Sequence, residues 1–192
     1  MSILEDAITF AANAHEGQIR KLSGTPYILH PLEVASIIST MTTDLETMAA
    51  GVLHDTVEDC GVALSELRER FGARVCALVE SETERRSDGR ADAETWQERK
   101  TTSLDDLRRT QDRDVKILWL ADKLSNVRSF YREYEKDGDR IWLSLHQKDP
   151  RMQAWYYRTI ADCLSELSDT SAYAEYIRLV SELFAGVPAA QP

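Results

Sequence analysis

Apolar residues recur every three or four positions through most of the chain, and this spacing is typical of helices rather than strands. Ser2 and Glu5 form a capping box ahead of an apolar face, which predicts a first helix from about Ile3 to Ala14. Pro31 suits the first turn of a second helix. His30 is therefore expected where that helix begins.

A third apolar segment follows Asp44, a residue type that caps helix N-termini. The predicted helix places His54 and Asp55 at or near its last turn. Ser65 begins the next helical pattern, which Gly72 is expected to end, with another helix continuing behind it.

The segment from Ser87 to Ala93 is charged and rich in small residues, so a mobile loop is expected there. Beyond it, Asp112 or Asp114 opens a long predicted helix that ends near Gly138.

Two final helices are predicted, after Pro150 and after Thr170. The chain has 192 residues, enough for one sizeable core, and shows no repeat or low-complexity linker. We therefore predict an all-α fold and one domain spanning 1–192, with the C-terminal helices (about 150–185) packed on the same core.

The formal net charge of −10 argues against nucleic acid or an anionic membrane as the main partner, because both require a cationic surface. Cys60, Cys76 and Cys163 are odd in number and widely spaced, so neither a disulfide framework nor a thiolate zinc site is expected. No signal peptide or apolar run of about 18 residues is apparent, and a cytoplasmic location is expected.

Histidines and carboxylates make up the candidate chemistry. Two imidazoles and two carboxylates are enough to hold one divalent metal, and Glu58 and Asp59 could then act on water. The alternative is a histidine that is merely hydrogen-bonded in the core. Three further polar clusters in the chain favour a site, whose candidate ligands are His30, His54, Asp55 and Asp122.

The long predicted helix gives a second indication of a functional site. Asp122, Asn126 and Ser129 are spaced i, i+4, i+7, so they share a face among positions that are otherwise apolar. A buried carboxylate requires a cation or hydrogen-bond donors. An ion pair of Asp122 with Lys116, Arg128 or another basic side chain is the alternative to a metal.

Four ordered motifs, AHEGQIRK, GTPYILHP, VLHDTVED and LADKLSN, carry a resemblance that runs from about Ala11 to Asn126. Together they resemble the hydrolase domain of the RelA/SpoT family, a branch of the HD-domain metal-dependent phosphohydrolases. The similarity is greatest to stand-alone small alarmone hydrolases, and a weaker part of it extends through Trp155-Tyr156-Tyr157-Arg158. An HD-type helical bundle is what the resemblance implies.

The resemblance also implies residue roles. It implies that His30, His54, Asp55 and Asp122 are the ligands of Mn(II). It also implies that Glu58 and Asp59 position or deprotonate the attacking water. The resemblance also implies that Arg20 and Lys21 contact the guanine nucleotide, and that Asn126 and Ser129 contact its sugar. Without the resemblance, Glu58 and Asp59 would be assigned to an acidic helix end. Arg20 and Lys21 would be assigned to a solvated loop, and Asn126 and Ser129 to a polar helix face.

The implied activity is Mn(II)-dependent 3′-pyrophosphohydrolysis of (p)ppGpp, which yields GDP or GTP and pyrophosphate. A small-molecule guanine nucleotide is the expected partner, and the chain is expected to lack the synthetase domain of larger family members. Two alternatives stay open: an HD phosphohydrolase for another nucleotide, and a non-catalytic nucleotide-binding module.

Other polar and aromatic residues have smaller expected roles. We expect His15 to hold the loop before the second helix, His146 to lie on the surface, and the aromatic cluster at Trp155 to pack in the core. The sequence does not choose among four basic residues that could reach the distal phosphates: Arg99, Lys100, Lys148 and Arg151.

Overall fold

The computed structural model describes residues 2–84, 92–188 and 190, and for 92 and 93 it describes the backbone only. In this part of the chain the elements are α1 (Ile3–Ala14), α2 (Leu29–Ile38), α3 (Leu45–Leu53), α4 (Thr56–Cys60), α5 (Leu64–Glu82), α6 (Asp92–Arg109), α7 (Arg113–Asp137), the 3-10 helix η1 (Gly138–Ser144), α8 (Pro150–Cys163), the 3-10 helix η2 (Ser165–Leu167) and α9 (Ser171–Leu183). The predicted all-α fold is confirmed.

The predicted helix starts are built by the expected local interactions. The Ser2 hydroxyl accepts the backbone N–H of Glu5, and the Glu5 carboxylate accepts that of Ser2, which completes the capping box. The Asp44 carboxylate accepts the N–H of Thr47 at the start of α3. These contacts satisfy backbone donors that have no partner inside their helices.

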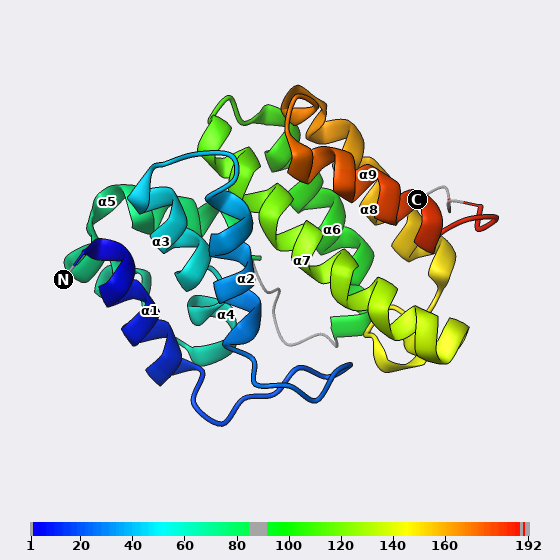
Figure 1. The fold of residues 1–192 in the computed structure, drawn as a ribbon, viewed down its shortest axis with the longest axis horizontal. Helices are drawn as coiled ribbons and strands as arrows, with labels where there is room; N and C mark the ends of the chain where they lie inside the picture. Colours follow the sequence, from blue (N-terminus) through cyan, green and yellow to red (C-terminus); the bar gives the residue numbers. More distant parts are fainter. Residues whose placement is uncertain (1, 85–91, 189, 191–192) are drawn as a thin grey trace.

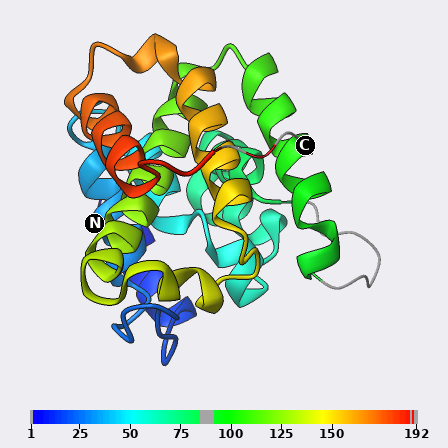
Figure 2. The same ribbon diagram turned by 90° about the vertical axis from the view of Figure 1, so that its right-hand side faces the viewer.

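Helix α7 lies at the centre of the molecule. In Figure 1, α1 to α5 lie on its left and α6, α8 and α9 on its right, with the two chain ends on opposite sides. Helix α7 packs on α2, α3 and α5 in the first group and on α9 in the second. Figure 2 shows α8 between α6 and α9, in agreement with its contacts to both.

One apolar cluster extends through both groups of helices, from Ala7 in α1 to Phe184 after α9. Leu118, Leu120 and Leu124 of α7 are fully buried within it. Helix α7 is therefore both the main support of the core and, through Asp122, a wall of the polar site described below.

The break predicted at Gly72 is present inside α5. Gly72 has φ 88° and ψ 171°, a backbone conformation that residues with a Cβ rarely adopt, and helical geometry resumes behind it. The long helix after Asp112 and the two helices after Pro150 and Thr170 are also confirmed.

The mobile loop expected from Ser87 to Ala93 lies mostly outside the described residues, at 87–91. The predicted loop is wrong at its C-terminal end, because residues 92 and 93 already belong to α6. That 18-residue helix was not predicted from the sequence. Its buried apolar side chains are few among many charged residues and include Trp96, Leu104 and Leu107.

None of the described helices combines the length and the apolar character that crossing a bilayer requires.

Candidate metal and nucleotide site

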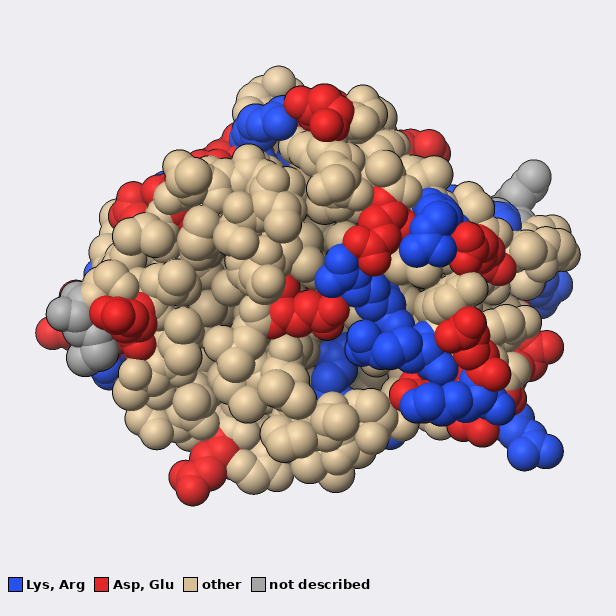
Figure 3. Space-filling view, viewed as in Figure 1, with Lys and Arg blue, Asp and Glu red and all other residues tan. Residues whose placement is uncertain are grey.

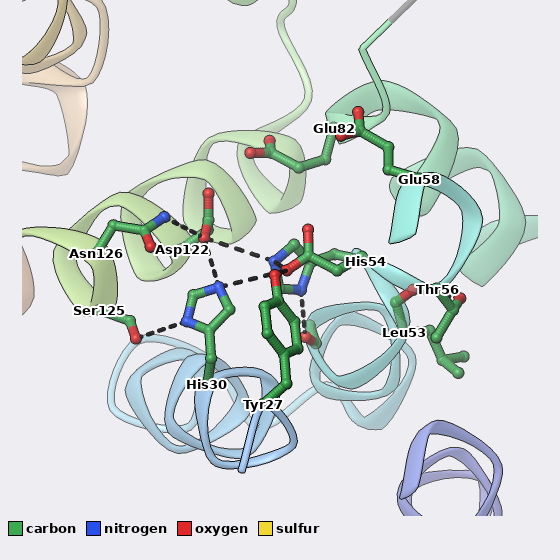
Figure 4. A network of polar contacts seen from close by, with 12 residues as sticks. Tyr27, His30, Leu53, His54, Thr56, Glu58, Glu82, Asp122, Ser125 and Asn126 are labelled. Atoms are coloured by element: carbon green, nitrogen blue, oxygen red, sulfur yellow. Dashed lines mark hydrogen bonds and ion pairs between the residues drawn. The ribbon is translucent and has the colours of Figure 1, made fainter. Parts of the chain in front are cut away.

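The four candidate metal ligands come from four different helices or helix ends. His30 lies in the first turn of α2, His54 caps the C-terminus of α3, Asp55 directly precedes α4, and Asp122 lies in α7. Figure 4 shows His30, His54 and Asp122 converging where these elements meet. The structure thus brings together residues that lie up to 92 positions apart in the sequence.

The Nε2 atoms of both imidazoles face both carboxylates. Asp122 Oδ1 lies 3.0 Å from His30 Nε2 and 3.5 Å from His54 Nε2. Asp55 Oδ2 lies 3.0 Å from His54 Nε2 and 3.5 Å from His30 Nε2. His30, His54 and Asp122 are buried and can offer their ligand atoms to one ion.

Hydrogen bonds on the far side of each ring fix its tautomer. His54 Nδ1 lies 2.9 Å from the carbonyl oxygen of Gly51, which can only accept, so Nδ1 carries the proton. His30 Nδ1 lies 2.8 Å from Ser125 Oγ, whose own proton goes to Glu33. Both Nε2 atoms are therefore free to act as ligands.

His54 Nε2 also provides the test of whether a metal fits. Although Asp55 Oδ2 lies 3.0 Å away, this buried nitrogen makes no hydrogen bond of suitable geometry with any described residue. A buried nitrogen lone pair that faces carboxylate oxygens is costly unless a cation binds it. A metal bound by imidazole nitrogens and carboxylate oxygens would remove that cost, so the donor set fits a divalent ion.

The pKa values in the site reflect its concentrated negative charge. Burial lowers the pKa of His30. Burial also acts to lower the pKa of His54, but Asp55 and Asp122 outweigh it and raise that pKa well above the ordinary value. For Asp122, burial is outweighed by Lys123 and the imidazoles, which hold its pKa well below the ordinary value. The carboxylates thus attract any available positive charge.

Lys123 supplies one such charge. Its Nζ atom lies 2.5 Å from Asp122 Oδ2 and 2.8 Å from Glu82 Oε1, and 4.7 Å from the ring centroid of Trp119. Lys123 binds the second oxygen of Asp122, while Oδ1 faces the imidazoles. One carboxylate oxygen of Asp122 is therefore held in an ion pair, while the other faces the two imidazoles.

The two basic residues named as alternative partners of Asp122 lie elsewhere. Lys116 pairs with Glu166, and Arg128 pairs with Glu33 and Glu175. Those two specific pairings are wrong.

Glu58 and Asp59 line a cleft of about 300 Å³, whose lining residues do not include the four candidate ligands. The Glu58 carboxylate accepts the backbone N–H of Glu84, and burial raises the pKa of Glu58. In Figure 4, Glu58 and Glu82 lie on the far side of the two imidazoles from α2. Asp59 is exposed and also lines a second cleft.

The second cleft, of about 450 Å³, contains Arg20, Lys21 and Asn126. Arg20 Nη2 donates to Asn126 Oδ1 over 2.9 Å, and Asn126 Nδ2 donates to Asp122 Oδ1 over 2.8 Å. This chain of contacts joins the loop between α1 and α2 to the candidate metal ligands. Ser129 is buried and lines a neighbouring cleft with Arg20.

The histidines outside the site contact the same loop. His15 Nδ1 lies 2.8 Å from Gln18 Oε1, and its ring stacks on Tyr27 at a centroid distance of 4.9 Å. His146 is exposed, and its Nε2 lies 2.8 Å from Lys21 Nζ. Both therefore help to position the residues around Arg20.

The structure separates the basic residues among which the sequence could not choose. Arg99 and Lys100 line the cleft that contains Glu58 and Asp59. Arg151 pairs with Asp149 at the start of α8, and Lys148 is exposed. Tyr156 and Tyr157 are buried, but they also form part of this cleft's wall.

Three residues that the sequence reasoning did not assign support the candidate ligands. Tyr27 Oη donates to Asp55 Oδ2 over 2.6 Å, while Ser125 and Lys123 hold His30 and Asp122 as described. All three lie inside the motifs that carried the resemblance, within three positions of a candidate ligand. That proximity is the signal that could have identified them.

Comparisons with known proteins identify the class. Residues 7–150 match the HD domain family model, so the chain belongs to the HD domain family. The HD domain is a fold of metal-dependent phosphohydrolases and implies a divalent metal. The predicted resemblance is confirmed.

Two curated relatives illustrate the sequence similarity. The guanosine-3′,5′-bis(diphosphate) 3′-pyrophosphohydrolase of Vibrio cholerae is 37% identical over 131 residues, which cover 66% of this chain and 18% of the relative. A probable GTP pyrophosphokinase of Mycobacterium leprae is 38% identical over 189 residues, which cover 94% of this chain and 23% of the relative. The chain thus spans less than a quarter of either protein.

Solved structures of similar size match the fold. A metazoan ortholog of SpoT, described as hydrolysing ppGpp, superposes with a TM-score of 0.71 at 25% identity, over 96% of this chain and 94% of that one. The structure of lmo0812 from Listeria monocytogenes superposes with a TM-score of 0.70 at 32% identity, over 81% and 98% respectively.

Proposed function

We propose that this protein is a Mn(II)-dependent 3′-pyrophosphohydrolase of (p)ppGpp. The observation that carries the proposal is the convergence of two imidazoles and two carboxylates beside clefts that contain both carboxylates and basic side chains. The relatives named above for this activity support the choice of substrate.

His30, His54, Asp55 and Asp122 would hold the metal. Their nitrogen and oxygen donors are compatible with Mn(II), and no thiolate is present among them to favour a softer ion. When bound, the metal would polarise the phosphoryl oxygens and make water more acidic. Tyr27, Ser125 and Lys123 would keep the ligands oriented through the contacts described above.

Glu58 and Asp59 would act on the attacking water. The water oxygen forms a bond to the 3′-linked phosphorus while the bond from that phosphorus to the ribose 3′-oxygen breaks. A carboxylate takes a proton from the water, and the ribose oxygen leaves as a hydroxyl after gaining a proton. We assign the role of base to Glu58, whose carboxylate is partly buried and whose pKa is raised by that burial.

Arg20 and Lys21 would bind the guanine nucleotide in the larger cleft. The Arg20 guanidinium lies 5.8 Å from the ring centroid of Tyr27, and its contact with Asn126 fixes its direction. A planar guanidinium so held can stack on a purine or bind phosphate. Asn126 and Ser129 would contact the sugar.

Local positive charge compensates for the acidic chain as a whole. Figure 3 shows Lys and Arg side chains gathered around a hollow on the face that carries α2 and α7, and Arg20, Arg132 and Lys136 line a cleft there. In the cleft with Glu58, the cations are Arg99 and Lys100, which we assign to the 3′-diphosphate.

A free nucleotide is the partner that this charge distribution favours. With a net charge of −10 and local groups of cations lining small clefts, the protein suits a small anion better than nucleic acid or an anionic membrane. We place the activity in the cytoplasm.

The proposal is tested by measuring the products formed from ppGpp and from a panel of other nucleotides by the Mn(II)-loaded protein. We expect GDP and pyrophosphate from ppGpp, with little turnover of nucleotides that lack a 3′-diphosphate. Turnover of another nucleotide in place of ppGpp would transfer the assignment to a different HD phosphohydrolase. Binding without any turnover would indicate a non-catalytic nucleotide-binding module.

A further inference from the structure

Glu84 binds the same cations that we assign to the 3′-diphosphate. Its Oε1 accepts a hydrogen bond from Lys100 Nζ, and its Oε2 accepts one from Arg99 Nη1. The Glu84 side chain is only 12% exposed and that of Lys100 17%, so both charges lie largely out of water. Burial would raise the pKa of Glu84, but Lys100 and other cations hold it below the ordinary value.

The arrangement resembles a phosphate site with an anion already in place. Two carboxylate oxygens lie where a lysine and an arginine converge, in the cleft that also contains the proposed base Glu58. A diphosphate entering this cleft would meet cations that are already paired. It must therefore compete with the Glu84 carboxylate for them.

Tyr156 provides an independent sign that the cleft binds a further group. Its hydroxyl is buried, and among the described residues it has no hydrogen-bond partner. Its ring lies beneath the same cation, with Lys100 Nζ 4.9 Å from the ring centroid. A buried hydroxyl without a partner is costly, and a phosphate oxygen in this cleft would satisfy it.

We propose that Glu84 is an internal competitor for the diphosphate subsite, whose carboxylate an incoming anion must displace from Lys100 and Arg99. The inference rests on the proposed function. A diphosphate carries more charge and more acceptor oxygens than one carboxylate, so it can displace Glu84 and also accept from Tyr156. A single phosphate gains less from the same exchange and so binds more weakly, but the cost of displacing Glu84 is the same for both anions.

Glu84→Gln tests the proposal with little change of shape. The amide removes the negative charge, while the backbone N–H that Glu58 accepts remains. Glu80→Gln is the matched control, because Glu80 is exposed near the end of α5, four residues before Glu84, and is not among the residues that line this cleft. Lys100→Gln removes the cation itself.

The first measurement is titration of inorganic pyrophosphate, and separately of inorganic phosphate, into the Mn(II)-loaded proteins by calorimetry. Removing the competing charge should tighten pyrophosphate binding by about tenfold in Glu84→Gln, and phosphate binding by a similar factor. Glu80→Gln should match the wild type, and Lys100→Gln should bind both anions more weakly. Pyrophosphate binding by Glu84→Gln that is unchanged or weaker overturns the proposal.

A second substitution tests whether the Tyr156 hydroxyl contributes to pyrophosphate binding. Tyr156→Phe in the Glu84→Gln background should weaken pyrophosphate binding, and unchanged binding removes the hydroxyl from the subsite. In turnover, Glu84→Gln should lower KM for ppGpp with kcat largely kept. The binding results do not require turnover, so a failure of the proposed hydrolase activity can be distinguished from a failure of this inference.

Discussion

Ser125 accepts the Nδ1 proton of His30 and donates its own proton to Glu33, and each of these contacts spans 2.8 Å. The chain has a direction because the carboxylate can only accept. It therefore sets the tautomer of a candidate metal ligand from outside the ligand set, and it leaves His30 Nε2 free to face Asp122.

Ser125→Ala should weaken Mn(II) binding by about 10- to 100-fold, the usual effect of losing a group that orients a metal ligand. The Nδ1 proton of His30 would lose its acceptor, and the ring could adopt the other tautomer. Metal affinity is measured by titration of metal-free protein, with Ser144→Ala as control because Ser144 is exposed. Equal affinity in Ser125→Ala and the wild type would remove this role from Ser125.

Arg20→Lys should raise KM for ppGpp by about tenfold while metal content stays at the wild-type level, because lysine keeps the charge but not the planar fork. The guanidinium donates to Asn126 and lies near the Tyr27 ring, and a flexible ammonium cannot reproduce both contacts. Steady-state kinetics and metal analysis of the same preparation separate the two effects. A lower kcat with KM unchanged would contradict a role in nucleotide binding.

The pH dependence of kcat should reflect Glu58. Burial raises its pKa above the ordinary value of 4.5, and a base acts only when deprotonated. Activity should therefore fall as the pH decreases through this raised pKa, so the acidic limb lies above pH 4.5. Glu58→Gln should retain metal, lose most turnover and lack this limb in any residual activity. A Glu58→Gln variant with the wild-type rate and profile would exclude Glu58 as the base.

Gly51→Ala should destabilise the fold, although alanine is normally favoured over glycine inside a helix. A Cβ at Gly51 would overlap Cδ1 of Ile38 and press on Val34, where α3 packs on α2. Such an overlap costs about 1–3 kcal/mol, more than the roughly 1 kcal/mol gained in helix propensity.

Urea denaturation checks this prediction through the free energy of unfolding. Ile38→Val removes the overlapping Cδ1 atom. Gly51→Ala should therefore lower the free energy of unfolding by less in the Ile38→Val background than in the wild type. An equal cost in both backgrounds would show that the close contact between α2 and α3 is not the cause.

Most helices were predictable from local chemistry. Interactions that span only a few residues can be recognised in the sequence. Examples are the capping box at Ser2, the cap at Asp44 and the break at Gly72. Helix α6 was not predicted because its stability depends on tertiary contacts. Trp96 packs edge-on against Tyr156 of α8, and the sequence of α6 contains too few such residues to form a clear apolar face.

The candidate ligands were found because the four motifs are specific when taken together, and the structure brings those residues to one place. Their roles as ligands and bases stay predictions. The contacts that support them depend on distances between helices. Nothing local shows that Lys123 joins Asp122 to Glu82 of another helix, or that Glu84 contacts both Lys100 and Glu58.

The most direct test of the account is pyrophosphate release from ppGpp as Mn(II) is added in steps to metal-free protein. We expect no release in chelator, release that rises to a plateau at one Mn(II) per chain, and neither binding nor release in Asp122→Ala. Release that persists in chelator, or that is undiminished in Asp122→Ala, would contradict the assignment of His30, His54, Asp55 and Asp122 as the ligands of a catalytic metal.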